Sequence, residues 1–281
     1  MKTLKKNLSF YIILLAISSS FAQNSPFKVD VIGEGKPVLF FPGFTCTAEV
    51  YKEALGELSK TNQCHIFTFA GFGGLAPIEK PWFPKIKESV KTYIAENKLE
   101  NATIVGHSMG GTLALWLASE ESNWFEKLII VDGLPATGAL MVPNYKSENM
   151  VYDNPFNTRL LEMDSQSFEQ MASQMANGMS LNKAKQPQIK DWIIQSDRET
   201  YVYGYTDLLK LDLREAISNI ETNVVILAAT HPYGQQMVKK TYEGQYQNLA
   251  DYTIEYAEGS AHFIMYDKPE WFLEQLNANL K

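Results

Sequence analysis

The sequence predicts an α/β fold: a mostly parallel, doubly wound sheet that carries a helical cap insertion. Two observations predict it. Short apolar, β-branched runs alternate with segments of helical periodicity through most of the chain. From about residue 134 to 206 that alternation stops, the stretch is rich in Met and Asn, and no strand-like run occurs. Strands that alternate with helices favour parallel pairing with right-handed crossovers.

The first 22 residues have the pattern of a signal peptide. Three lysines (Lys2, Lys5 and Lys6) precede an apolar run over residues 8–17, and Ser20-Phe21-Ala22 supplies small residues for cleavage near Ala22–Gln23. We expect the protein to be periplasmic or secreted; the alternative is an uncleaved N-terminal anchor. The apolar run is short for a membrane span and no second run follows, so stable membrane anchoring is not expected.

Composition narrows the class of partner. The formal net charge of the 281 residues is −7, and removal of residues 1–22, with three lysines and no acids, takes it to −10. An acidic exported protein is a poor candidate for nucleic acid or for an anionic membrane surface. Two cysteines, Cys46 and Cys64, are too few for a disulfide scaffold; they either pair with each other or remain as buried thiols.

The remaining chain is long enough for one α/β domain with an insertion. We expect a first core segment at 23–133, the cap at 134–206 and a second core segment at 207–281. Residues 29–35 alternate like an edge strand, whereas 37–41 are solidly apolar, as in a strand buried on both faces. The other expected strands of the core are 65–69, 101–105, 127–133, 223–229 and 252–256. The expected core helices are 48–59, 86–97, 112–118, 235–248 and 269–280.

The cap is expected to be helical, over residues 165–177, 188–196 and 198–210. Phe168, Met171 and Met175 share one helical face, which predicts the apolar underside of a cap. A flexible apolar acyl pocket is the sharper interpretation of the same residues. The glycines of residues 70–74 do not follow the order of a nucleotide-binding loop, and no P-loop lysine follows them.

The segment around Ser108 predicts a nucleophile. A short apolar strand leads into Gly106-His107-Ser108-Met109-Gly110, and a helix with small residues follows. A strand, a sharp turn and a helix around Gly-x-Ser-x-Gly form a nucleophile elbow, which lifts the serine hydroxyl above the sheet edge. Gly43, directly after the strand 37–41, lets the next loop approach a ligand closely, so residues 42–49 are expected to contribute to an oxyanion hole.

A serine hydroxyl needs a neighbouring base. The chain has four histidines: His65 opens a strand, His107 lies inside the elbow and His231 follows a strand. His262 lies in the loop between the last strand and the last helix, and such loops meet at the carboxyl edge of a parallel sheet, where ligands bind. We therefore predict His262 as the base. His231 is expected to be a surface histidine, with substrate contact as the alternative.

The elbow, together with the late Ala261-His262-Phe263, resembles the α/β-hydrolase superfamily over essentially the whole exported chain. The resemblance implies an oxyanion hole formed by the N–H groups of Phe44 and Met109. Most members carry the triad acid in the loop after the penultimate strand, here residues 229–234, which contain no carboxylate. A minority place it after the strand that follows the nucleophile's helix, which implies Asp132.

Four other carboxylates are weaker alternatives for the acid: Glu258, Asp267, Asp207 and Asp212. The resulting hypothesis is an exported serine esterase that cleaves a small or medium carboxylic ester through a Ser-His-Asp triad and an acyl-enzyme. No cofactor or metal is expected, because no cluster of His, Cys or carboxylate has ligand spacing. The alternatives are an amidase, lactonase or aminopeptidase of the same fold, and a non-catalytic ligand-binding relative.

Overall fold

The computed structural model describes residues 25–280, so the predicted signal peptide lies outside the described residues. Within them, one sheet has the strand order β1-β3-β2-β4-β5-β6-β7. Its strands are β1 (Phe27–Ile32), β2 (Lys36–Phe41), β3 (Asn62–Phe69), β4 (Ala102–His107), β5 (Phe125–Val131), β6 (Asn223–Ala229) and β7 (Tyr252–Ala257). No helix among the described residues is both long enough and apolar enough to cross a membrane.

The sheet confirms the predicted α/β class. Strand β1 pairs antiparallel with β3 at one edge, and every other pairing is parallel. The central strand β4 is buried along its whole length, as its mostly apolar and β-branched sequence predicts. Parallel strands place their carboxyl ends at one edge, so the loops after β2, β4, β5, β6 and β7 all emerge together there.

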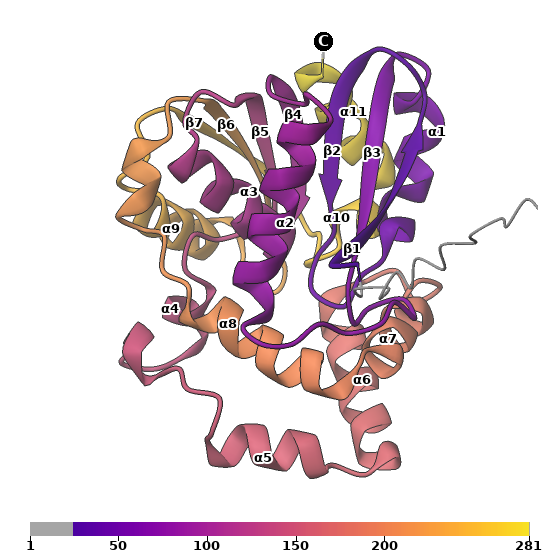
Figure 1. Ribbon diagram of the computed structural model, residues 1–281, viewed down its shortest axis with the longest axis vertical. Coiled ribbons are helices and arrows are strands. Elements are labelled where there is room, and N and C mark those ends of the chain that lie inside the picture. The colour runs from indigo at the N-terminus through magenta and orange to yellow at the C-terminus, as the bar shows by residue number, and fades with distance from the viewer. Residues whose placement is uncertain (1–24, 281) are drawn as a thin grey trace, which may run out of the picture.

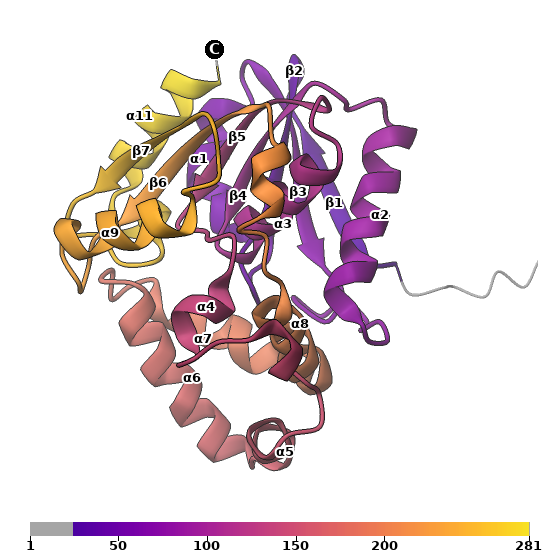
Figure 2. The same ribbon diagram turned by 90° about the vertical axis from the view of Figure 1, so that its left-hand side faces the viewer.

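Helices cover both faces of the sheet (Figures 1 and 2). The helices of the core are α1 (Lys52–Leu58), α2 (Trp82–Glu96), α3 (Met109–Glu120), α9 (Gln235–Gln245), α10 (Ile264–Asp267) and α11 (Pro269–Asn279). Helices α2, α3 and α9 share one apolar cluster with the sheet, whereas α1 and α11 share the cluster on the other face. Two-sided coverage of this kind defines a doubly wound sheet.

The segment between β5 and β6 forms a helical layer below the strand ends (Figure 1). It contains α4 (Thr137–Met141), α5 (Pro155–Glu162), α6 (Ser165–Met179), α7 (Gln186–Gln195), the π-helical turn Thr200–Gly204 and α8 (Tyr205–Lys210). Helices α4 and α5 have no counterpart among the predicted helices, because both are short. The predicted cap boundary at residue 206 falls inside α8, since one helix carries the chain from the cap back to the core.

Helix α2 begins four residues before its predicted start at Ile86. The cause is a distant residue, Asp207 of α8, whose carboxylate accepts hydrogen bonds from the N–H groups of Trp82 (2.7 Å) and Phe83 (3.1 Å). Free N–H groups at a helix start need such acceptors. Asp207 therefore joins the cap to the core through the first turn of α2.

Candidate active site

Ser108 occupies the sharp turn between β4 and α3. Its backbone adopts φ 54° and ψ −120°, outside the regions that ordinary residues favour. The flanking glycines are needed for close approach. A Cβ on Gly106 would lie 2.4 Å from the carbonyl oxygen of Gly110, and a Cβ on Gly110 would lie 2.2 Å from that of Phe41. The turn therefore has the geometry predicted for a nucleophile elbow.

Asp132 and His262 are brought together at the carboxyl edge of the sheet. Asp132 directly follows β5, and His262 lies in the loop after β7. The Nδ1 of His262 lies 2.6 Å from the Oδ2 of Asp132. The two side chains are only 28% and 16% exposed, respectively. Because Nδ1–H donates to the carboxylate, the neutral imidazole keeps its lone pair on Nε2, the atom that a base would use.

The second oxygen of Asp132 is also fully engaged. Its Oδ1 accepts hydrogen bonds from the N–H of Ala229 (2.9 Å) and from the hydroxyl of Tyr242 (2.8 Å). Burial by itself raises the pKa of the Asp132 carboxyl, but the hydrogen bond and charge of His262, with the two further donors, hold that pKa below its usual value. Asp132 thus remains a carboxylate that can orient an imidazole and stabilise its cation.

His107 links the elbow to the His262 loop. Its Nε2 lies 3.1 Å from the backbone oxygen of His262, and the two imidazole centroids are 4.7 Å apart. Since a carbonyl can only accept, Nε2 of His107 carries the proton; its Nδ1 has no hydrogen-bond partner among the described residues. Burial lowers the pKa of His107 to about 3, so this histidine stays neutral and holds the His262 backbone rather than acting as a base.

The loop after β2, which was expected to contribute to an oxyanion hole, lies against the elbow. A Cβ on Gly43 would lie 2.8 Å from the Nδ1 of His107 and 3.3 Å from the Cβ of Ser108. Within residues 25–280 the N–H of Phe44 donates to no acceptor. Met109 is the first residue of α3, where N–H groups lack an intrahelical acceptor and carry the positive end of the helix dipole.

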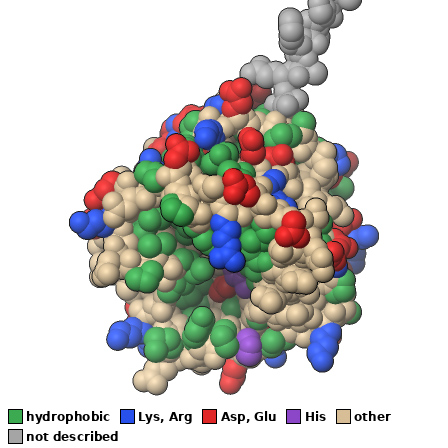
Figure 3. Space-filling model, turned by 90° about the horizontal axis from the view of Figure 1, so that it is seen from below, with side chains coloured by type: hydrophobic (Ala, Val, Ile, Leu, Met, Phe, Trp, Pro, Cys, Tyr) green, Lys and Arg blue, Asp and Glu red, His purple; other side chains and the backbone are tan. Residues whose placement is uncertain are grey.

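Aromatic side chains of the core and the cap fix the position of Phe44. Its ring packs on Phe72 (5.0 Å between centroids), Tyr205 (5.4 Å) and Tyr201 (5.8 Å). Tyr201 belongs to the π-helical turn and Tyr205 begins α8. The cap therefore contacts the loop that carries a candidate oxyanion donor. The cap face seen in Figure 3 is hollowed, with hydrophobic side chains around histidine and acidic side chains.

The four carboxylates considered as alternatives for the acid are either exposed or bonded to other groups. Glu258 is exposed, Asp212 binds Arg214 with an Oδ2–Nη2 distance of 2.6 Å, and Asp207 caps α2. The Asp267 carboxylate accepts hydrogen bonds from backbone N–H groups and a serine hydroxyl. None of these four is bonded to His262 among the described residues, so Asp132 is the carboxylate that the structure places on the imidazole.

His231 is exposed, as expected for a surface histidine. Both cysteines are free and buried, which excludes the alternative of a Cys46–Cys64 disulfide in this structure. Burial raises the pKa of the Cys64 thiol to about 11 and that of Cys46 further, so neither is a thiolate near neutral pH. No group of three or more His, Cys, Asp or Glu in residues 25–280 has the geometry of a metal site.

Two site residues were not predicted from the sequence in their observed roles. Tyr242 was assigned only to a helix, and its contact with Asp132 spans 110 positions of the chain. His107 was placed in the elbow with its side chain away from the Ser108 hydroxyl, but its bond to the His262 backbone was not foreseen. The one local signal was the histidine directly before the serine, on a strand otherwise made of apolar and small residues.

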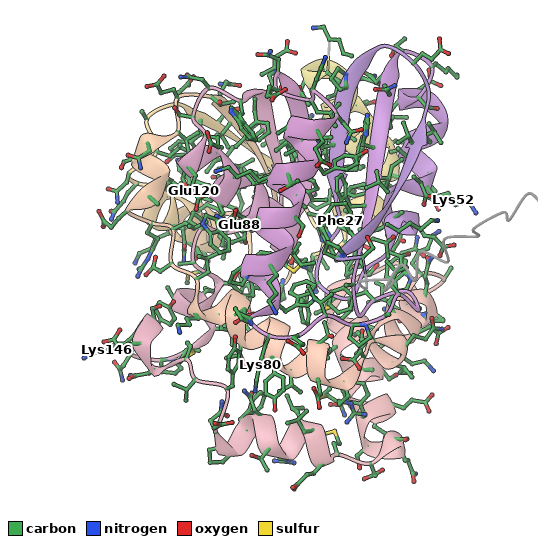
Figure 4. All side chains as sticks on the ribbon, viewed as in Figure 1. Phe27, Lys52, Lys80, Glu88, Glu120 and Lys146 are labelled. Atoms are coloured by element: carbon green, nitrogen blue, oxygen red, sulfur yellow. The ribbon has the colours of Figure 1, made fainter. Side chains whose placement is uncertain are left out.

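A cavity of about 850 Å³ lies in the cap beside α5, and its lining includes neither Asp132 nor His262. Tyr152 and Tyr203 form one wall of this cavity. The ammonium of Lys80, at the junction of core and cap in Figure 4, lies 4.0 Å from the ring centroid of Tyr203 and 4.9 Å from that of Tyr152. This contact fastens the loop before α2 to the cap.

Comparison with known proteins agrees with this architecture. A model of the alpha/beta hydrolase family matches residues 38–275. The chain belongs to this family. It is 26% identical over 211 residues to the AB hydrolase superfamily protein YisY of Bacillus subtilis (strain 168), covering 71% of this chain and 75% of that protein.

A pimeloyl-[acyl-carrier protein] methyl ester esterase of Vibrio cholerae (serotype O1, strain El Tor Inaba N16961) is 21% identical over 252 residues, covering 88% of this chain and 94% of that protein. Among solved structures, the esterase EaEST of Exiguobacterium antarcticum superposes with a TM-score of 0.75 at 18% identity, covering 90% of this chain and 95% of the esterase. At that identity the structural likeness establishes the fold.

Proposed function

We propose that this α/β hydrolase family member is a serine hydrolase that cleaves carboxylic esters, with Ser108 as nucleophile, His262 as base and Asp132 as the acid. The observation that carries the proposal is the 2.6 Å contact between His262 Nδ1 and Asp132 Oδ2 beside the elbow. A serine at the elbow and a histidine bonded to a carboxylate are the parts that acyl transfer to water requires.

In the proposed mechanism, the Ser108 hydroxyl attacks the ester carbonyl while Nε2 of His262 takes its proton. The oxyanion forms facing the N–H groups of Phe44 and Met109, at the positive end of α3. His262 then gives the proton to the leaving alcohol. A water then attacks the acyl-enzyme while Nε2 of His262 takes its proton, and His262 passes that proton to the Ser108 oxygen as the bond to the acyl group breaks and the carboxylic acid is released. Asp132 stabilises the imidazolium that forms in both halves of the reaction.

The proposed acyl group is small or medium and apolar. The aromatic residues that pack on Phe44, and the methionines of α6 that line the cap side of the core, favour such a group. The name of the Vibrio relative, a methyl ester esterase, supports an ester with a small alcohol as leaving group. An exported location, from the predicted signal peptide at residues 1–22, belongs to the same proposal.

A series of p-nitrophenyl esters of increasing acyl length tests this proposal on the wild type, Ser108→Ala and Asp132→Asn. We expect turnover by the wild type, with an optimum that measures the acyl pocket, and a loss of about a thousandfold or more in kcat for both variants. Turnover that survives in Ser108→Ala contradicts the mechanism. Hydrolysis of amides but not of any ester would replace the substrate class and keep the triad.

A further inference from the structure

The loop that carries His262 is held by the cap as well as by the core. From the side chain of Asp267, at the end of α10, Oδ2 accepts a hydrogen bond from the N–H of Ala261 at 2.8 Å. Its Oδ1 accepts three more, from the Ser180 hydroxyl (2.6 Å) and the N–H groups of Leu181 (2.9 Å) and Asn182 (3.1 Å). One carboxylate therefore joins the residue before His262 to the turn between α6 and α7.

The residue after His262 is held from the same side. The N–H of Phe263 donates to the carbonyl oxygen of Met179, the last residue of α6, at 3.0 Å. The side-chain amide of Asn182 donates to the carbonyl oxygen of Tyr266, also at 3.0 Å. Ser180 is fully buried and Ala261 is 1% exposed, so the bonds of these two residues to Asp267 are partly shielded from water, whereas Leu181 is exposed. Buried hydrogen bonds to a charged group are stronger than bonds between neutral groups.

We propose that Asp267 is a positioning residue. Its carboxylate links the α6–α7 turn of the cap to the His262 loop by hydrogen bonds and thereby fixes the position of both segments; we call this link the clasp. The imidazole is already fixed through Nδ1 by Asp132, and the backbone oxygen of His262 by His107. Asp267 and Met179 fix the N–H groups on either side of it. Displacement of this part of the cap consequently displaces the base relative to Ser108.

The inference rests on the proposed function, because it treats His262 as the base. It adds that the cap contributes to catalysis through the backbone of the His262 loop as well as by covering the substrate. The rate of proton transfer to a base falls steeply when the base is displaced slightly from hydrogen-bonding distance. Loss of the clasp is therefore expected to lower kcat, whereas the apolar contacts that bind the acyl group, and with them KM, change little.

The test compares Asp267→Asn with two matched variants. Asp267→Asn keeps the size of the side chain but replaces one acceptor oxygen with an NH₂ group that faces an N–H donor. Ser180→Ala removes the hydroxyl that donates to Asp267 and accepts from the N–H of Asn182, and it leaves the bond of Asp267 to Ala261 intact. Asp164→Asn changes the N-cap of the opposite end of α6, where the carboxylate accepts from the N–H and hydroxyl of Ser167. If Asp267→Asn does not fold, Asp267→Ser takes its place.

Two readouts are measured on each full-length variant. The first is kcat and KM on the best p-nitrophenyl ester. The second, which needs no turnover, is the low-field proton resonance of His262 Nδ1–H, assigned by its loss in His262→Gln. We expect Asp267→Asn to lower kcat about 10- to 100-fold with KM within threefold, and to shift or broaden the resonance. Ser180→Ala and Asp164→Asn should keep kcat within threefold and leave the resonance in place.

The inference is overturned if a folded Asp267→Asn or Asp267→Ser protein keeps both kcat and the His262 resonance of the wild type. It is also overturned if Asp164→Asn reproduces the effects of Asp267→Asn. A wild type that hydrolyses no ester would contradict the proposed function, and the resonance alone would then decide whether Asp267 positions the His262 loop.

Discussion

Tyr242 donates its hydroxyl proton to Asp132 at 2.8 Å, on the carboxylate oxygen that does not face His262. Burial, followed by the neighbouring charge of Asp132, raises the pKa of the Tyr242 hydroxyl well above its usual value, so it remains a donor. The acid that orients the imidazole is thus itself oriented by a helix of the core, α9.

Replacement of Tyr242 by Phe removes that donor from Asp132. We expect kcat to fall several-fold and the free energy of unfolding to fall by about 1–2 kcal/mol, because a buried carboxylate loses a hydrogen bond. Ester kinetics and urea denaturation measure the two effects. Tyr246→Phe is the matched control: its ring stacks on Tyr242 at 6.0 Å, but its hydroxyl donates to the Gly133 carbonyl. Equal losses of kcat in the two variants would contradict the role given to Tyr242.

Asp132→Asn tests the position of the acid. An amide at this site can present its NH₂ group to Nδ1 of His262 and so favour the wrong tautomer, and we expect kcat to fall on the order of 10⁴-fold. Steady-state kinetics on a p-nitrophenyl ester measure it. Asp212→Asn, which loses only the ion pair with Arg214, is expected to keep the wild-type kcat. An active Asp132→Asn protein would show that another carboxylate serves His262.

Gly43→Ala tests the approach of the oxyanion loop to the elbow. The new methyl group would lie 2.8 Å from the Nδ1 of His107, so the loop must move and take the Phe44 N–H with it. Loss of one oxyanion donor costs about 10²–10³-fold in kcat, and we expect a loss of that order. Gly56→Ala in α1, where a Cβ meets nothing within 4 Å, should leave kcat unchanged and raise stability by about 0.5–1 kcal/mol. Wild-type kcat in Gly43→Ala would contradict the assignment of this loop.

The buried His107 predicts how stability changes with pH. Burial lowers its pKa from 6.5 to about 3, so between these values the unfolded chain binds a proton that the folded protein does not. The free energy of unfolding therefore falls as the pH falls through this window, by up to about 1.4 kcal/mol per pH unit from this residue. Urea denaturation between pH 7 and pH 4 measures the slope.

His107→Asn should remove this part of the slope, whereas replacement of the exposed His231 by Asn should leave it in place. The lowered pKa of Asp132 adds a loss of the same sign, but at more acidic pH, below the usual value of 3.8 for its carboxyl. A His107→Asn protein with the slope of the wild type would show that His107 titrates alike in the folded and unfolded states.

The local sequence pattern was enough to predict the strands of the sheet and the nucleophile elbow. A strand such as β4 is apolar because both of its faces are buried, and its sequence carries that information without reference to any other segment. Gly106 and Gly110 similarly follow from the close approach that the turn imposes. The placement of His262 came from topology, because loops after parallel strands meet at one edge.

Contacts between distant segments could not be predicted from the sequence. The start of α2 depends on Asp207, 125 positions away, and the state of Asp132 depends on Tyr242, 110 positions away. Asp267 was considered only as an acid for His262, since proximity in sequence gave no sign that its carboxylate faces Ala261 and the cap. Such bonds depend on the packing of complete elements, which periodicity does not encode.

Activation of Ser108 by His262 is tested most directly by labelling with a fluorophosphonate probe, followed by intact-protein and peptide mass spectrometry, on the wild type, Ser108→Ala and His262→Gln. We expect one adduct on the wild type, located at Ser108, no adduct on Ser108→Ala and much slower labelling of His262→Gln. A folded wild type that takes up no probe, or an adduct that persists in Ser108→Ala, would contradict it.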